Sequence, residues 1–139
     1  LYWLGQESEK TILSVTDING NVLWEWASQE ATFELYAIPL QTVIISPEIS
    51  FVLTLRILCA LYKGNELWKI KDEESDFSYA TAVAGNSIIV VRGSEIQLID
   101  SEGNTEFQLD LEEKIVTAPV VDAGGKIYVA GDQNLYCIE

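Results

Sequence analysis

The sequence contains no histidine and no methionine, and among its 139 residues are only two cysteines, three prolines and eight basic residues. Without histidine the chain cannot use an imidazole as a general base or as a metal ligand. Two cysteines are too few for a disulfide framework of the kind found in small secreted domains, so the cysteine content does not indicate whether the protein resides in an oxidising or a reducing compartment. Any catalysis on this chain would have to use lysine or carboxylate chemistry.

Basic residues are far outnumbered by acidic ones, because 22 Asp and Glu give a formal net charge of −14. Such a surface is repelled by phosphate backbones and by anionic lipid headgroups. The most apolar run, Val43 to Leu61, contains Pro47, Glu48 and Arg56, and charged residues are costly at the centre of a bilayer. The composition therefore predicts buried strands, no membrane insertion and no nucleic-acid partner.

A repeat of about forty residues runs along the chain, and a period of this length indicates a repeat architecture. Its anchor is Gly-Asn followed, three residues after the Asn, by a large aromatic side chain. The copies are Gly20-Asn21 with Trp24, Gly64-Asn65 with Trp68, and Gly103-Asn104 with Phe107. Apolar pairs precede each anchor, and a fourth pair ends the chain: Leu13 and Val15, Ile57 and Cys59, Ile96 and Leu98, Leu135 and Cys137.

The best-preserved copy predicts four strands separated by residues typical of hairpin turns. These strands are Tyr79–Val83, Ser87–Val91, Glu95–Asp100 and Thr105–Leu109. Four short antiparallel strands repeated at this period are typical of a β-propeller blade. We predict an all-β protein of about 3.5 four-stranded blades: a partial blade 1–28, blades 35–72 and 79–111, and a partial blade 117–139.

Two segments carry a resemblance to a known family. Ala118 to Gly131 with Leu135 to Ile138, and Thr16 to Trp24, resemble the pyrroloquinoline-quinone-type (PQQ-like) propeller repeat. The resemblance implies that the repeated Trp docks between blades. Most members with this repeat do not bind the quinone, and many are scaffolds, envelope-assembly lipoproteins or sensory ectodomains. It therefore implies a non-catalytic module that binds a protein or polymer partner, as part of a larger extracytoplasmic protein.

The chain opens in what should be the second strand of one blade and closes after the third strand of another. There is no initiator methionine, and the first four residues lack the basic flank of a signal peptide. We expect a segment of a six- to eight-bladed propeller, or a ring completed by another chain, with blades assembled across protomers as a third possibility. The partial blades are expected to leave exposed sheet faces.

The second copy differs from the others. Phe51 to Leu61 contains no Gly, Asn or Asp where the other copies turn, although a turn must still occur there. Leu61 also stands where we align the acids Asp17, Asp100 and Glu139. The high β-propensity and low charge of this segment predict aggregation if it is left unpaired.

Several residues invite a functional interpretation. Cys59 and Cys137 align with Val15 and Leu98, which predicts two buried free thiols. The aromatics Trp24, Trp68 and Phe107 recur once per repeat and, like Gly20, Gly64 and Gly103, are predicted to be structural. Trp3 and Trp26 do not recur, so they are candidates for an exposed contact.

The repeated acids are predicted to accept hydrogen bonds from turn amides, and no segment shows a complete calcium-binding loop. The acidic clusters Glu73 to Asp76 and Glu112-Glu113 are predicted to be solvated linkers. A pair of carboxylates could serve glycoside hydrolysis only in a closed ring. We predict no catalytic, cofactor-binding or metal-binding residue in this chain. The alternative is a piece of a quinone-dependent oxidoreductase whose catalytic residues lie elsewhere, although the adjacent cysteine pair typical of many such enzymes is missing.

Overall fold

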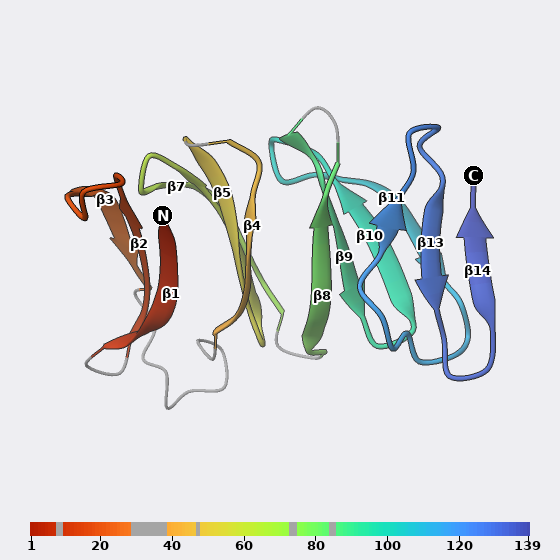
Figure 1. The fold of residues 1–139 in the computed structure, drawn as a ribbon. Helices are drawn as coiled ribbons and strands as arrows, with labels where there is room; N and C mark the ends of the chain where they lie inside the picture. Colours follow the sequence, from red (N-terminus) through yellow and green to blue (C-terminus); the bar gives the residue numbers. More distant parts are fainter. Residues whose placement is uncertain (8–9, 29–38, 47, 73–74, 84–85) are drawn as a thin grey trace. The chain divides into compact units, whose positions relative to one another are not determined.

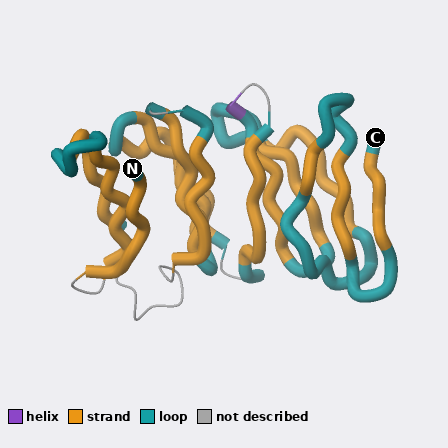
Figure 2. Tube along the Cα trace, viewed as in Figure 1, coloured by secondary structure: helices purple, strands orange, loops and turns teal. Residues whose placement is uncertain are grey.

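The computed structural model describes residues 1–7, 10–28, 39–46, 48–72, 75–83 and 86–139. Their regular structure is mainly antiparallel strand joined by loops and turns (Figures 1 and 2). The chain divides into two compact units, Leu1–Glu73 and Glu74–Glu139. Within the described residues, no helix combines the length and the apolar character needed to cross a membrane.

The first unit contains two sheets, each formed by strands that follow one another in the chain. The first sheet has the order β1-β2-β3 and the second the order β4-β5-β6-β7. The bounds are β1 (Tyr2–Glu7), β2 (Lys10–Thr16), β3 (Val22–Ala27), β4 (Pro39–Ile44), β5 (Ile49–Thr54), β6 (Ile57–Tyr62) and β7 (Asn65–Lys71). Every neighbouring pair is antiparallel, so each sheet is a meander.

The second unit repeats this pattern with one four-stranded and one three-stranded sheet. Its strands are β8 (Phe77–Ala82), β9 (Ile88–Arg92), β10 (Glu95–Ile99), β11 (Thr105–Asp110), β12 (Val120–Val121), β13 (Ile127–Ala130) and β14 (Leu135–Ile138). The first four strands agree with the predicted ones to within two residues at each end. Turn chemistry and β-propensity were sufficient to place them.

The core of the first unit lies between its two sheets. Leu13 from β2 is buried with four side chains from β5 and β6, namely Val52, Ile57, Cys59 and Leu61. Leu4, Trp24 and Trp26 of the first sheet pack against this cluster while remaining partly exposed. Removal of this apolar surface from water stabilises the pair of sheets, as it does in any sheet-on-sheet packing.

In the second unit the segment that follows β11 joins the two sheets. Ile115 is buried with Ile89, Val91 and Ile96 of one sheet and Val129 of the other. Its backbone N–H donates to the carbonyl oxygen of Gly93 at 2.9 Å, and the residue forms a β-bridge with Gly131. Side chains of β8 add two bonds to the same segment: Tyr79 Oη donates to the Val116 carbonyl at 3.0 Å and Thr81 Oγ1 to the Pro119 carbonyl at 2.7 Å.

The turn that the second copy had to contain lies at Leu55-Arg56, between β5 and β6. The hydroxyl of Thr54 accepts a hydrogen bond from the Ile57 N–H at 2.9 Å and donates to the Ile57 carbonyl at 3.2 Å. Neither turn residue adopts a positive φ. Because a threonine hydroxyl can close a turn in this way, the segment turns without Gly, Asn or Asp.

A short turn between β6 and β7 shifts the alignment of the second copy. Lys63 and Gly64 have φ values of 49° and 79°, and they alone connect the paired residues Tyr62 and Asn65.

The cross-strand partners of the recurring aromatics show the shift. Trp24 lies opposite Val15 and Phe107 opposite Leu98, whereas Trp68 lies opposite Ala60. The predicted equivalence of Cys59 with Val15 and Leu98 is therefore wrong by one residue. Leu61 is likewise a buried strand residue, paired with Glu66, so no acid is required there.

Candidate functional site

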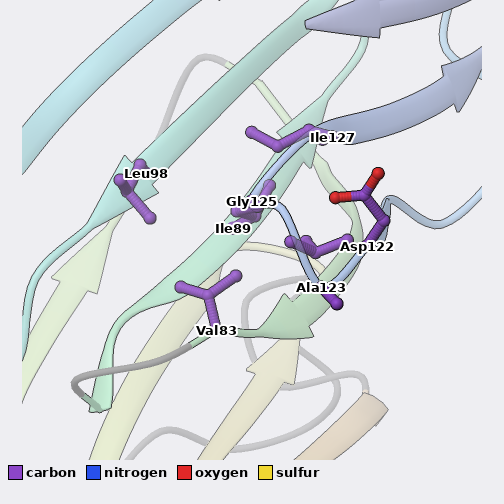
Figure 3. A pocket seen from close by; sticks show the side chains of 8 residues that line it. Val83, Ile89, Leu98, Asp122, Ala123, Gly125 and Ile127 are labelled. Atoms are coloured by element: carbon purple, nitrogen blue, oxygen red, sulfur yellow. The ribbon is translucent and has the colours of Figure 1, made fainter. Parts of the chain in front are cut away.

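A pocket of about 460 Å³ opens between the two sheets of the second unit (Figure 3). It lies at the end of these sheets where β8 leads to β9, β10 turns into β11 and β12 turns into β13 (Figure 1). Its apolar lining comes from Val83, Ile89, Leu98, Val121 and Ile127, and the β12–β13 turn contributes Asp122, Ala123 and Gly125. Sequence reasoning missed this pocket because apolar strand residues predict a filled core in the same way that they predict a lining.

Among the described residues that line the pocket, Asp122 has the one ionisable side chain. Its Oδ1 accepts hydrogen bonds from the backbone N–H groups of Gly124 at 2.8 Å and Lys126 at 3.0 Å, and its Oδ2 accepts one from Tyr128 Oη at 3.2 Å. These donors, the Lys126 amide first, hold the pKa of Asp122 below its ordinary value. The side chain is thus an exposed carboxylate, ionised at neutral pH and held in one orientation.

Two other turns use an aspartate in the same way, which confirms the prediction that these acids accept hydrogen bonds from turn amides. Asp17 Oδ1 accepts from the N–H groups of Asn19 and Asn21 at 2.7 and 2.9 Å. Asp100 Oδ1 accepts from those of Glu102 and Asn104, both at 2.8 Å. Hydrogen bonds from Asn21 and Asn104 lower the pKa of the two aspartates. The third predicted acid, Glu139, instead pairs with the ammonium group of Lys126.

A sequence signal for the Asp122 turn was present. In all three turns a glycine follows the aspartate by three residues, and Gly20, Gly103 and Gly125 have φ values of 86°, 90° and 84°. An L-residue with a side chain is strained in this region, which explains why glycine recurs there. Gly64 also has a positive φ, but in the shorter β6–β7 turn.

The predicted contact residues Trp3 and Trp26 lie on opposite faces of the first sheet. Leu4, Leu13 and Trp26 form one row across the sheet, and Trp3, Ser14 and Glu25 form the adjacent row. Adjacent rows point to opposite faces. Trp3 is 51% exposed, with its ring over Gly5, whereas Trp26 packs against the core cluster of the first unit. The two indoles therefore do not form a common contact surface.

The recurring aromatics occupy the outermost strands of their sheets. Trp24 packs against the core cluster, and its ring lies 3.2 Å from where a Cβ on Gly64 would be. The rings of Trp68 and Phe51 are 5.6 Å apart between centroids, in a tilted arrangement. Phe107 is 38% exposed. The interpretation that all three dock between blades stays a prediction.

The two cysteines have different environments. Neither cysteine is in a disulfide, and Cys59 is buried as predicted, but Cys137 is exposed. Cys137 lies on β14, which pairs with β13 alone, and it occupies the face opposite to Tyr136 and Ile138, which pack on the unit's core. Because no described strand covers that face, the prediction of two buried thiols is wrong for Cys137.

The prediction that the acidic clusters are simple solvated linkers is wrong for Glu113, whose carboxylate is held by three hydrogen bonds. Glu73 and Glu74 of the other cluster lie outside the described residues. The Oε1 of Glu113 accepts hydrogen bonds from Asn134 Nδ2 at 2.9 Å and Tyr136 Oη at 2.5 Å, and its Oε2 accepts from the Gln133 N–H at 2.9 Å. Its side chain also fills the space that a Cβ on Gly131 would need. Glu113 thus ties the segment after β11 to the β13–β14 turn.

These contacts predict a pH-dependent contribution to stability. Hydrogen bonds from Tyr136 first, and then from Asn134, lower the pKa of Glu113 from its ordinary 4.5. The stabilisation is therefore present above pH 4.5 and is lost as the pH falls through the lower pKa of the folded state. We expect Glu113→Gln to lower the urea midpoint at pH 7, and the difference from the wild type to shrink below pH 4.5. Glu106→Gln, at an exposed position on β11, is the control; a difference from the wild type that stayed constant with pH for Glu113→Gln would contradict the linkage.

The described residues contain no group of three or more Cys, Asp and Glu side chains placed to hold a metal ion. Among the described residues that line the pocket, no second titratable side chain accompanies Asp122; the Tyr128 hydroxyl that donates to it lies outside the lining. What the pocket offers chemically is apolar contact and one fixed negative charge.

Comparison with known proteins identifies the fold class. No family model matches the sequence, and no curated protein matches it. Among solved structures, BamB from Moraxella catarrhalis is similar, with a TM-score of 0.71 and 17% identity over 99% of this chain and 44% of that one. The WD40 β-propeller domain of Doa1 has a TM-score of 0.66 and 13% identity, over 93% of this chain and 46% of that one.

BBS1N, solved in complex with ARL6, is also similar, with a TM-score of 0.61 and 13% identity over 99% of this chain and 45% of that one. At these identities the likeness concerns the fold alone. The chain spans less than half the length of each of these three structures. The predicted fold class is confirmed: the chain has the fold of a segment of a β-propeller.

Proposed function

We propose that this chain is a non-catalytic part of a β-propeller that binds a protein partner, and that the pocket of the second unit is where the partner docks. The observation that carries the proposal is the combination of an open apolar lining with a fixed, exposed carboxylate at its edge. Binding sites in proteins typically join an apolar lining to a small number of placed polar groups.

A protein partner is favoured by the size and position of the pocket. A pocket of about 460 Å³ can receive one or two side chains. It is open at the end of the sheets that carries the β12–β13 turn, where a polypeptide can lie across it. BBS1N was solved in complex with ARL6, so a propeller of related fold holds a protein partner. A catalytic role is disfavoured because the described residues of the lining place no second titratable side chain beside the carboxylate of Asp122.

Two finer statements belong to the same proposal. We assign the repeat to the PQQ-like type, on the resemblance of the segments that contain Trp24 and Tyr128. We also propose that the chain belongs to a larger extracytoplasmic protein, on that resemblance and on the 44% to 46% of the similar structures that it spans. The coding sequence on either side of this chain tests both, since it would reveal further repeats and an export signal.

The docking proposal is tested by filling the pocket. Ala123 lines it, is exposed and lacks a positive φ, so Ala123→Phe places a ring in the pocket without strain in the turn. Peptides selected from a display library against the wild-type chain are expected to shift the amide resonances of Val83, Leu98 and Val121, and to bind the variant at least about tenfold more weakly.

Thr105→Phe adds the same ring at an exposed position of β11 that does not line the pocket, and is the matched control. Equal binding to the wild type and to Ala123→Phe, or resonance shifts confined to other residues, would refute docking at this pocket.

A further inference from the structure

Resting on the proposed function, we infer that the partner presents a basic segment: one apolar side chain enters the pocket while a neighbouring lysine or arginine pairs with Asp122. The pocket, the fixed carboxylate and the charge of the surrounding unit each support part of this description.

The apolar part follows from the lining. Val83, Ile89, Leu98, Val121 and Ile127 surround the space with aliphatic carbon. Figure 3 shows the side chains of Val83, Ile89, Leu98 and Ile127 around it. A leucine, isoleucine or phenylalanine side chain that entered would exchange water for these contacts. A charged side chain in the same space would lose its hydration without a partner, except at the edge where Asp122 lies.

The charged part follows from the way in which Asp122 is held. Three donors fix its carboxylate, yet a carboxylate has about four acceptor sites, so it retains acceptor capacity toward solvent. Lys126, in the same turn, does not supply a cation to it, because its ammonium group pairs with Glu139. A cation from outside can therefore pair with a carboxylate that needs no reorientation, which lowers the entropic cost of binding.

The charge of the unit favours the same partner at longer range. Glu74 to Glu139 contain twelve acidic and three basic residues, a formal net charge of −9. Arg92, another of the three basic residues, is paired with Glu95 at 2.6 Å. Asp100 and Glu102 add negative charge in the β10–β11 turn, at the same end of the sheets as the pocket (Figure 1). Such a field accelerates the approach of a basic segment and repels an acidic one.

The test uses synthetic nonapeptides with blocked ends as probes. One has a central leucine flanked by lysines, a second has the same leucine flanked by glutamates, and a third replaces the leucine of the first by glycine. Fluorescence anisotropy at about 20 mM salt, where surface charges are weakly screened, measures binding to the full chain. We expect the lysine-flanked leucine peptide to bind at least about tenfold more tightly than either of the others.

Two charge-removing variants locate the interaction. Asp122→Asn keeps an Oδ1 that can accept from Gly124 and Lys126 while it removes the charge, and we expect it to weaken the lysine-flanked peptide about three- to tenfold. Asp17→Asn makes the same change in the β2–β3 turn of the other unit, where the aspartate accepts the same kind of amide hydrogen bonds, and is expected to leave binding unchanged. Circular dichroism and urea titration verify that both variants stay folded.

The outcomes separate the two proposals. If the lysine- and glutamate-flanked peptides bind alike and Ala123→Phe abolishes both, the basic partner is wrong and docking at the pocket stands. If Asp17→Asn weakens binding as much as Asp122→Asn, the attraction is a general effect of the acidic surface and the inference is overturned. If Ala123→Phe leaves binding of the lysine-flanked peptide unchanged, the pocket is not the docking site and both proposals fail.

Discussion

Leu61→Asp is expected to unfold the first unit. Leu61 is fully buried in the cluster that joins the two sheets of that unit, with Leu13, Val52 and Cys59. The substitution removes the apolar contacts of leucine and places a carboxylate where no described side chain of the cluster can pair with it. Both effects act in the same direction, and we expect a loss of more than about 4 kcal/mol, comparable to the whole stability of many domains. Urea denaturation followed by tryptophan fluorescence measures it.

Leu67→Asp is the matched control, because Leu67 lies on β7 in the same sheet and is 55% exposed. It should cost less than about 1 kcal/mol. The comparison also decides the alignment of the second copy. If position 61 were the acid-bearing turn position that the repeat pattern indicates, Leu61→Asp would be tolerated as well as the control.

Ile115→Ala is expected to cost about 2 to 4 kcal/mol in the second unit. Ile115 is 1% exposed, and it packs against side chains of both sheets there, such as Ile96 and Val129. Truncation leaves a cavity at the point where the segment after β11 holds the two sheets together. Protection of the amides of β13 from hydrogen exchange should fall together with the urea midpoint.

The neighbouring Val116→Ala serves as the control. Val116 is 41% exposed, and its backbone N–H bond to the Ala130 carbonyl is unaffected by the change. We expect a loss below about 1 kcal/mol. Equal losses at the two positions would mean that the segment contributes through its backbone bonds and not through the burial of Ile115.

The strands and their grouping were predictable because their causes are local. Alternating apolar residues, β-branched content and Gly-Asn turns place β8 to β11 to within two residues, and a hydrogen bond from a turn amide to an aspartate four residues earlier depends on that turn alone. The turn at Leu55-Arg56 was required but could not be placed, because the hydroxyl that closes it belongs to a threonine, a residue equally suited to a strand.

The pocket and the role of Glu113 could not be predicted, since both depend on residues brought together by packing. Val83 and Asp122 meet at the pocket although 39 residues separate them in the chain. The sequence predicts a linker acid at Glu113, and only the packing of the β13–β14 hairpin against it supplies its three donors, two from the turn and one from Tyr136 on β14.

The sequence by itself determined the repeat, the strands, the acidic character and the absence of histidine chemistry, because these follow from residue types and short-range spacing. The tertiary structure decided which repeated positions are equivalent, which of the two cysteines is covered, and that Trp3 and Trp26 face apart. Those properties depend on strand register and on what packs over each face. A change of a single residue in a turn shifts the register, and a shift of one residue exchanges the two faces of a strand.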